Sequence, residues 1–200
     1  GGVVARTWVK YEAILKKENA FDFDDLLVVA ANLLQSNKSV RNYYLKIWRY
    51  IHIDEYQDTN EVQYKIAKLL SSEQRNLCVV GDIDQNIYSW RGANIRNILN
   101  FEKDYPGAKL VVLEENYRST QTILAVANRI IDKNKMRRKK VLFTSNALGE
   151  KMGLFEALDE SQEAAYVAEK AKILQKKGVP LSEMAVLYRA NFQSRALEEA

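Results

Sequence analysis

The feature that most constrains the fold of this chain is a short apolar strand that ends on two adjacent carboxylates. The strand candidate is Ile51–Ile53, and Asp54 and Glu55 follow it directly, before a polar turn and a helix. Open α/β sheets bind ligands at the carboxyl ends of their strands. A hard cation such as Mg²⁺ takes one or two carboxylates and otherwise keeps water and phosphate oxygens. Asp54 is therefore a candidate Mg²⁺ ligand and Glu55 a candidate base for an attacking water; two solvated acids are the alternative.

The composition is that of an ordinary globular protein. The chain has 200 residues, of which 47% are hydrophobic and 28% charged, and no apolar run approaches the roughly 18 residues of a membrane span. No secretory signal opens the chain. The single cysteine, Cys78, lies in an apolar pattern and is expected in the core; a lone cysteine favours a reducing, cytoplasmic setting. The net charge of +4 permits nucleic-acid binding without demonstrating it.

Strand and helix patterns alternate at the spacing of a parallel α/β sheet. After Ile51–Ile53, strands are expected at residues 76–81, 109–113, 140–143, 154–157 and 184–188. Helices are expected at residues 7–17, from 21 onward with Asp22, Asp24 and Asp25 as N-cap and first-turn acids, and at 39–48, 60–71, 95–105, 120–133 and 161–177. A second α/β series begins near residue 114, so the expected domains are 1–113 and 114–200.

The loop after the second strand candidate, residues 81–93, carries a second set of polar and aromatic groups. Gln85 stands at the strand end, where its amide can bond both a γ-phosphate and a water. Tyr88, Trp90 and Arg91 follow. Exposed aromatic rings beside an arginine form a stacking platform for unpaired bases. A tryptophan in the core is the alternative for Trp90.

A basic block follows the helix expected at 120–133. It consists of Lys133, Lys135, Arg137, Arg138, Lys139 and Lys140. A run of like charges between a helix and a strand is usually a solvated loop, and we expect one here. Contact with phosphates is the alternative.

The two acids, the loop at 81–93 and a third block, "LEENYRST", stand in a fixed order along the chain. Together they resemble the consecutive motifs of superfamily 1 DNA helicases of the UvrD/PcrA/Rep type: "IDEYQDTN" resembles the Walker B motif, and the other two blocks the third and fourth motifs. "FDFDDLL" and "LYRANFQSR" resemble further stretches of that family, so the resemblance covers nearly the whole chain. It implies an α/β fold with RecA-like parallel sheets and flanking helices, in parts of two tandem RecA-like domains. Residues 1–113 would be the C-terminal part of the first, with preceding helices of its inserted subdomain, and 114–200 the N-terminal part of the second.

The resemblance also implies a nucleotide site for ATP and Mg²⁺. Asp54 matches the Mg²⁺ ligand, Glu55 the residue that activates the hydrolytic water, and Gln85 the sensor of the γ-phosphate and water. Arg118 matches an arginine that reaches the γ-phosphate, where a planar, permanently charged guanidinium suits the charge of the transition state. Tyr117 matches a ring that packs against adenine, with packing between domains as its alternative.

The implied partner is DNA, as single strands and as junctions between single and double strands. Gln57 matches a position that helps couple the nucleotide and DNA sites. Tyr88 and Trp90 match DNA contacts, and Trp90 would stack on a base. Arg91 suits a structural ion pair as readily as a phosphate contact.

The chain departs from the family pattern in a few places. His52, Asn86 and Glu115 stand where Val, Ser and Gln are usual, and the lone histidine is expected to be a core or near-surface residue rather than a catalytic one. No GxxxxGK[ST] loop is present to cradle the phosphates. The chain thus resembles the middle of a longer motor and is expected to hydrolyse no ATP alone.

The resemblance implies an ATP-dependent DNA helicase that moves 3′-to-5′ on single-stranded DNA and unwinds duplexes in repair or replication. The motor of a helicase–nuclease is one alternative, which a nuclease carboxylate cluster elsewhere would reveal. A non-catalytic DNA-binding protein on a helicase fold is another. The presence of Asp54, Glu55, Gln85 and Arg118 argues against it, because a scaffold requires none of them.

Overall fold

The computed structural model describes residues 2–135 and 138–200, so Arg137 of the basic block lies outside the described residues. The chain folds as two compact units. The first comprises Gly1–Ser119 with Leu124–Asn146, and the second Thr120–Ile123 with Ala147–Ala200. Among the described residues, no helix combines the length and apolar character needed to cross a bilayer.

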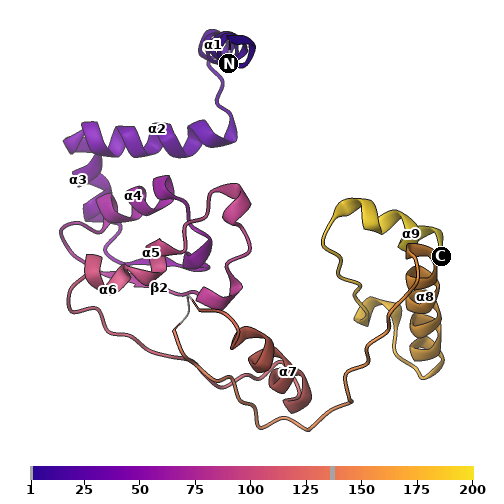
Figure 1. Ribbon diagram of the computed structural model, residues 1–200. Helices are drawn as coiled ribbons and strands as arrows, with labels where there is room; N and C mark the ends of the chain where they lie inside the picture. Colours follow the sequence, from indigo (N-terminus) through magenta and orange to yellow (C-terminus); the bar gives the residue numbers. More distant parts are fainter. Residues whose placement is uncertain (1, 136–137) are drawn as a thin grey trace. The chain divides into compact units, whose positions relative to one another are not determined.

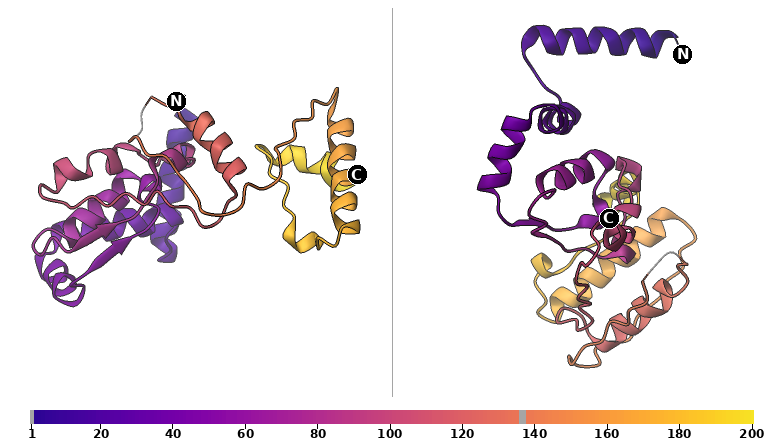
Figure 2. Two further views of the ribbon diagram at one scale, coloured as in Figure 1. Left: turned by 90° about the horizontal axis from the view of Figure 1, so that it is seen from below. Right: turned by 90° about the vertical axis from the view of Figure 1, so that its left-hand side faces the viewer.

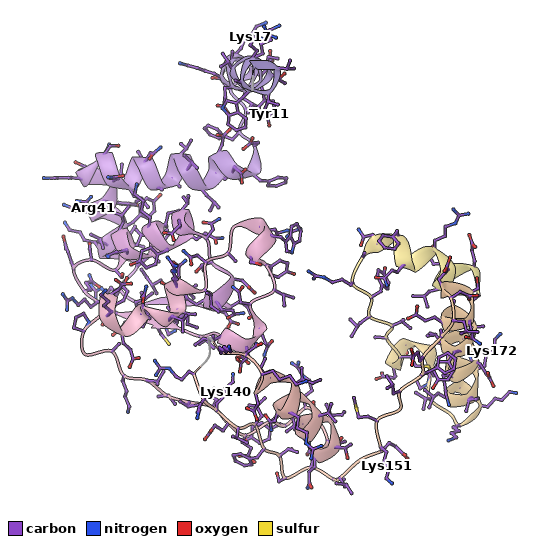
Figure 3. All side chains as sticks on the ribbon, in the orientation of Figure 1. Tyr11, Lys17, Arg41, Lys140, Lys151 and Lys172 are labelled. Atoms are coloured by element: carbon purple, nitrogen blue, oxygen red, sulfur yellow. The ribbon has the colours of Figure 1, made fainter. Side chains whose placement is uncertain are left out.

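The first unit begins with helices. They are α1 (Gly2–Glu18), α2 (Phe23–Ser36), α3 (Lys38–Ile47) and α4 (Glu61–Leu70); α2, α3 and α4 pack against one another (Figure 1). The expected N-cap of α2 is confirmed, because Asp22 accepts the N–H of Asp25 and the Asp25 carboxylate accepts that of Asp22. On α1, Tyr11 donates to Asp22 at 2.9 Å, and on α3 Arg41 donates to the Leu34 carbonyl at 3.2 Å (Figure 3).

The sheet of the first unit is parallel, as predicted. Strands β1 (Ile51–Ile53) and β2 (Leu77–Val79) pair in parallel, and α4 lies between them in the chain. The ladder continues past both strands: Val80 donates to the Ile53 carbonyl at 2.8 Å, and Tyr56 donates to the Val80 carbonyl at 2.9 Å. A crossover of this kind sets two carboxyl ends side by side.

Buried apolar residues come from each of the packed helices and from the turn after β1. They are Ala31, Leu34, Leu45, Tyr56 and Ala67, and Leu124, in the later segment of the first unit, is buried as well. Tyr56 is fully buried and meets Phe101 edge to face, with 5.8 Å between ring centroids. Phe101 in turn stacks on Tyr105 at 4.8 Å, and the Tyr105 hydroxyl lies 3.0 Å from that of Ser71. The turn after β1 is therefore anchored in the core, and burial raises the pKa of the Tyr56 phenol.

The helix expected at 95–105 forms as two short helices, α5 (Arg96–Leu99) and α6 (Phe101–Asp104). Asn100 interrupts them with a ψ of 2°, and its N–H bonds back to Arg96. The apolar period runs through both helices, but this local turn divides them.

The prediction of strands beyond residue 108 is wrong for the described part of the chain. No strand forms at residues 109–113, 140–143, 154–157 and 184–188 (Figure 2). A single isolated bridge joins Glu115 to Phe143 within the described residues. Apolar side chains there are exposed, Leu113 by 76%, Leu154 by 98% and Leu187 by 96%. A strand needs a neighbouring strand to receive its main-chain hydrogen bonds, and an apolar run alone does not supply one.

The core position expected for Cys78 is also wrong, because its side chain is exposed. Cys78 is the register partner of His52, which is exposed as well. Successive side chains of a strand point to opposite faces. The central residues of β1 and β2 thus share a face that the described residues leave open, and His52 lies near the surface as expected.

The remaining helices are α7 (Gln121–Ile131), α8 (Glu160–Lys176) and α9 (Ser194–Glu199). In the second unit α8 contacts α9, and Asp159 caps α8 by accepting the Gln162 N–H at 2.8 Å. Phe155 stacks on Tyr166 of α8, with ring centroids 3.9 Å apart. This stack and the buried Ala164 form the small core of that unit.

The α2 interface makes a direct prediction about stability. Leu34 is 7% exposed and its neighbour Leu33 is 46% exposed. Leu34→Ala should lower the free energy of unfolding by about 2–5 kcal/mol because it opens a cavity, whereas Leu33→Ala should change it by less than about 1 kcal/mol. Urea denaturation of this chain measures both; equal losses would show that α2 does not pack through Leu34.

Candidate functional site

Two loops leave the carboxyl ends of β1 and β2 and meet at one edge of the sheet. Asp54 and Glu55 follow β1, as predicted; Asp54 is exposed, and its Oδ1 accepts the Glu55 N–H at 2.9 Å. Glu55 has φ 50° and ψ 39°, in the left-handed region. That conformation costs a residue with a side chain about 1–2 kcal/mol. This bend turns the chain from β1 into the short 3-10 helix Tyr56–Asp58.

A buried amide joins the two loops. Gln57 is fully buried, and its Nε2 donates to Glu55 Oε2 at 2.7 Å and to Asp58 Oδ2 at 3.2 Å. Its Oε1 accepts the main-chain N–H of Asp82, in the loop after β2, at 2.9 Å. The side chain of Gln57 therefore fixes the Glu55 carboxylate relative to the second loop.

Two residues to which the sequence analysis assigned no role, Gly81 and Asn86, hold Gln57 in place. A Cβ on Gly81 would lie 2.6 Å from Gln57 Oε1 and 3.2 Å from the Tyr56 nitrogen, so the close approach of the two loops requires glycine there. Asn86, one of the departures from the family pattern, donates its amide to the Gln57 carbonyl. A glycine directly after a strand can indicate a close approach of the backbone to another segment, and Gly81 was that signal in the sequence.

Gln85 is tied to the same network through Asp82. Gln85 Nε2 donates to Asp82 Oδ2 at 2.8 Å, and Asp82 Oδ1 accepts the Asp84 N–H at 3.0 Å. Lys140, labelled in Figure 3, forms an ion pair with the same carboxylate. Burial opposes the charge of Asp82, but the hydrogen bonds from Lys140 and Gln85 outweigh it and lower the pKa of the carboxyl.

The basic block is not simply a solvated loop. Arg138 pairs with Glu102, and Lys140 with Asp82. Glu102 lies on α6 and Asp82 in the loop after β2, so these two ion pairs hold the segment after α7 against both. No local pattern indicates these pairs, because their members lie far apart along the chain.

The aromatic residues of the second loop form an exposed cluster around the 3-10 helix Ser89–Arg91. Trp90 is 67% and Tyr88 40% exposed, with ring centroids 6.3 Å apart. The guanidinium carbon of Arg91 lies 4.7 Å from the Trp90 centroid and 5.5 Å from that of Tyr88, at cation–π distance. Trp90 is therefore not a core residue in this structure, and Arg91 contacts rings.

A polar cleft of about 270 Å³ opens beside this cluster. Its lining residues are Asp58, Asn60, Gln63, Tyr88 and Arg91. Asp58 accepts from Gln57, so the cleft, the aromatic cluster and the buried amide are neighbours. This arrangement gives an exposed pair of aromatic rings with one cation, Arg91, against them and polar groups at their side.

Tyr117 and Arg118 lie in a different loop. Tyr117 is 77% exposed, and its hydroxyl donates to Glu115 Oε2 at 2.8 Å, a bond that raises the pKa of the phenol. The Arg118 side chain is exposed, and within the described residues no hydrogen bond or ion pair links it to Glu55 or Gln85. Hydrogen bonds thus connect Asp54, Glu55, Gln57 and Gln85, and among the described residues none extends this network to Tyr117 or Arg118.

Asp54 suits a metal ion that is only partly held by protein. Among the described residues, no group of three or more His, Cys, Asp or Glu side chains could form a closed metal site. Mg²⁺ commonly binds through one or two carboxylates and completes its shell with water and phosphate oxygens. The exposed carboxylate of Asp54 fits that requirement.

Comparison with known proteins identifies the family. Residues 2–106 match the UvrD/REP helicase N-terminal domain, and residues 111–200 match the UvrD-like helicase C-terminal domain. The chain is 50% identical over 197 residues, or 98% of its length, to proteins named ATP-dependent DNA helicase PcrA from Staphylococcus aureus and Staphylococcus epidermidis. It spans 27% of the length of these relatives.

The matches also bear on the predicted architecture. Domains of this type have RecA-like α/β folds, so the predicted fold class is confirmed, and the parallel pair β1–β2 agrees with it. The predicted division at residue 114 stays a prediction. Since the two family models together cover almost every residue, the chain belongs to the UvrD-like helicase family.

Proposed function

We propose that the full-length protein containing this chain is an ATP-dependent DNA helicase. It hydrolyses Mg-ATP, moves 3′-to-5′ on single-stranded DNA and unwinds duplexes at junctions with single strands. The observation that carries this proposal is the buried Gln57 amide, which joins the acid Glu55 to the loop of Gln85 and Trp90. The relatives' name, ATP-dependent DNA helicase, supports the same activity.

In this proposal the chain's own groups divide the work at the nucleotide. Glu55 takes the proton of the attacking water, and Gln85 orients that water against the γ-phosphate. Asp54 holds Mg²⁺, which when bound offsets charge on the phosphate oxygens. Arg118 stabilises the charge that grows on the γ-phosphate, and Tyr117 packs against adenine. The left-handed backbone at Glu55 supports a functional role, since such strain clusters at active sites.

The aromatic cluster serves DNA. Bases of a single strand stack on Trp90 and Tyr88, and Arg91 adds positive charge beside the rings. A shift of this loop on DNA binding passes through Asp82 and Gln57 to the Glu55 carboxylate, so DNA contact and hydrolysis are coupled. We place this activity in DNA repair or replication, because the family resemblance implies it, and in the cytoplasm, because a lone cysteine favours a reducing setting.

The roles of the two acids are separable in the full-length protein. Glu55→Gln should bind Mg-ATP normally and lower kcat by on the order of 10²-fold or more, because a general base is lost. Asp54→Asn should instead raise the Mg²⁺ concentration needed for half-maximal ATP binding, since a carboxylate ligand is lost. Steady-state ATP hydrolysis and Mg²⁺ titrations of ATP binding measure the two effects.

Two controls bracket that comparison. Glu73→Gln removes an exposed carboxylate from the turn before β2, at the opposite end of that strand from the site, and should leave kcat unchanged. The chain by itself, which holds no phosphate-cradling glycine loop, should give no turnover. A Glu55→Gln protein that hydrolyses ATP at the normal rate would show that Glu55 is not the base.

Trp90 tests the link to DNA. Trp90→Ala should weaken single-strand affinity by about 1–3 kcal/mol and lower DNA stimulation of ATP hydrolysis, because a stacking ring is lost. The melting temperature should barely move, since the side chain is 67% exposed. Fluorescence anisotropy with a labelled oligonucleotide and a thermal melt of the same protein give both numbers.

Trp48→Ala is the matched control, because Trp48 is 47% exposed and its ring lies 4.6 Å from that of Tyr44, away from the aromatic cluster. It should leave single-strand affinity unchanged. The stacking role would fall if Trp90→Ala cost about 3–5 kcal/mol of stability, as core truncation does, while affinity per folded molecule stayed the same.

A further inference from the structure

The loop that carries Tyr117 and Arg118 is held by hydrogen bonds from Asn146, a residue that belongs to none of the family motifs. Asn146 Nδ2 donates to the carbonyl oxygens of Tyr117 and Ser119, each at 3.1 Å. These two carbonyls flank Arg118 in the chain. A single side-chain amide therefore fixes the main chain on both sides of Arg118.

A second asparagine holds the same turn from within. Asn116 Oδ1 accepts the main-chain N–H of Arg118 at 3.0 Å and of Ser119 at 2.7 Å. The N–H of Arg118 and the carbonyls on either side of it are thus all bound to asparagine side chains. The Arg118 side chain is exposed. The asparagines therefore fix the main chain at Arg118, while its guanidinium can still reach a ligand.

Main-chain bonds join the two segments that carry these asparagines. Asn116 donates its N–H to the Phe143 carbonyl at 2.7 Å, and Phe143 donates to the Glu114 carbonyl at 3.0 Å. These bonds form the isolated bridge between Glu115 and Phe143. This bridge sets Asn146, three residues beyond Phe143, against the turn at Tyr117–Ser119.

We infer that Asn146 is a positioning residue of the nucleotide site, which holds Arg118 where its guanidinium can meet the γ-phosphate of ATP. This inference rests on the proposed function of Arg118. Stabilisation of transition-state charge depends on donors that are already in place, and small displacements cost much of the effect. ATP has a γ-phosphate and ADP does not, so the preference for ATP over ADP should depend on the hydrogen bonds from Asn146.

Asn128 offers a matched control on the same segment. Its Nδ2 donates to the Leu142 carbonyl at 2.8 Å, and its Oδ1 accepts the Leu142 N–H at 3.3 Å. Asn128 therefore supports the chain four residues before Asn146, and both of these bonds go to Leu142 rather than to the Tyr117–Ser119 turn. A purely structural role for the two asparagines predicts similar effects from both.

The experiment compares Asn146→Asp, Asn128→Asp and Arg118→Ala in the full-length protein. Aspartate keeps the shape of asparagine but cannot donate, so Asn146→Asp loses both bonds to the turn. The readout is the ratio of the Kd for ADP to the Kd for the non-hydrolysable triphosphate AMPPNP, measured by displacement of a fluorescent ADP. Melting curves run alongside, and each titration is made at a temperature where the variant is folded.

Arg118→Ala and Asn146→Asp should both lower the preference for the triphosphate, by on the order of tenfold, whereas Asn128→Asp should keep it within about twofold. A preference lost in Arg118→Ala but kept in Asn146→Asp would overturn the positioning role and leave the proposed function standing. A preference kept in Arg118→Ala would overturn the role of Arg118 and that of Asn146 with it. If Asn146→Asp does not fold, Asn146→Ser, whose hydroxyl is too short to reach both carbonyls, is judged by the same outcomes.

Discussion

The buried side-chain amide of Gln57 is the interaction on which the arrangement at the edge of the sheet depends. Its nitrogen binds Glu55 and Asp58, and its oxygen binds the main chain of Asp82. A buried amide that loses a partner costs about 1–3 kcal/mol, so the two loops are held at the spacing that this side chain spans. The glycine at position 81 follows from that spacing, because any side chain there would strike the Gln57 oxygen.

The Gln57 amide also provides a direct hydrogen-bonded path for the proposed coupling between the nucleotide and DNA sites. On one side stands Glu55, whose backbone is strained and whose carboxylate is held by Gln57. On the other stands Asp82, whose carboxylate binds Gln85 and pairs with Lys140. A change at either loop alters the hydrogen-bond partners of Gln57. In the proposed function, hydrolysis and DNA contact would influence each other through these few hydrogen bonds.

Local features of the fold could be predicted from the sequence. The N-cap at Asp22, the helix that begins after Asn60 and the strands at Ile51–Ile53 and Leu77–Val79 follow from capping residues and apolar periods that lie within a few positions. The acid pair and Gln85 could be placed at strand ends for the same reason. Their positions depend on neighbours in the chain.

What could not be predicted depends on partners distant in the chain. Residues 109–113 and 184–188 have the apolar runs of buried strands, but no strand in the described structure pairs with them. Cys78 has the pattern of a core residue and lies on an open face. Lys140 and Asn146 belong to no motif. Lys140 contacts Asp82, which is 58 positions away in the chain, and Asn146 contacts Tyr117, which is 29 positions away. Sequence spacing carries no signal for such contacts.

The most direct test of the coupling role is Gln57→Glu in the full-length protein. Glutamate keeps the length of the side chain and an oxygen for the Asp82 N–H but loses the donor to Glu55 and adds a negative charge beside it. The matched control is Gln74→Glu, which removes a similar amide donor, from Gln74 to the Leu45 carbonyl, away from the site.

The quantity to measure is the ratio of ATP hydrolysis with saturating single-stranded DNA to hydrolysis without DNA. Gln57→Glu should lower this ratio by on the order of tenfold, because the link between the loops is broken, while Gln74→Glu should leave it unchanged. A Gln57→Glu protein that hydrolyses ATP and keeps the normal stimulation by DNA would show that the buried amide supports the fold alone.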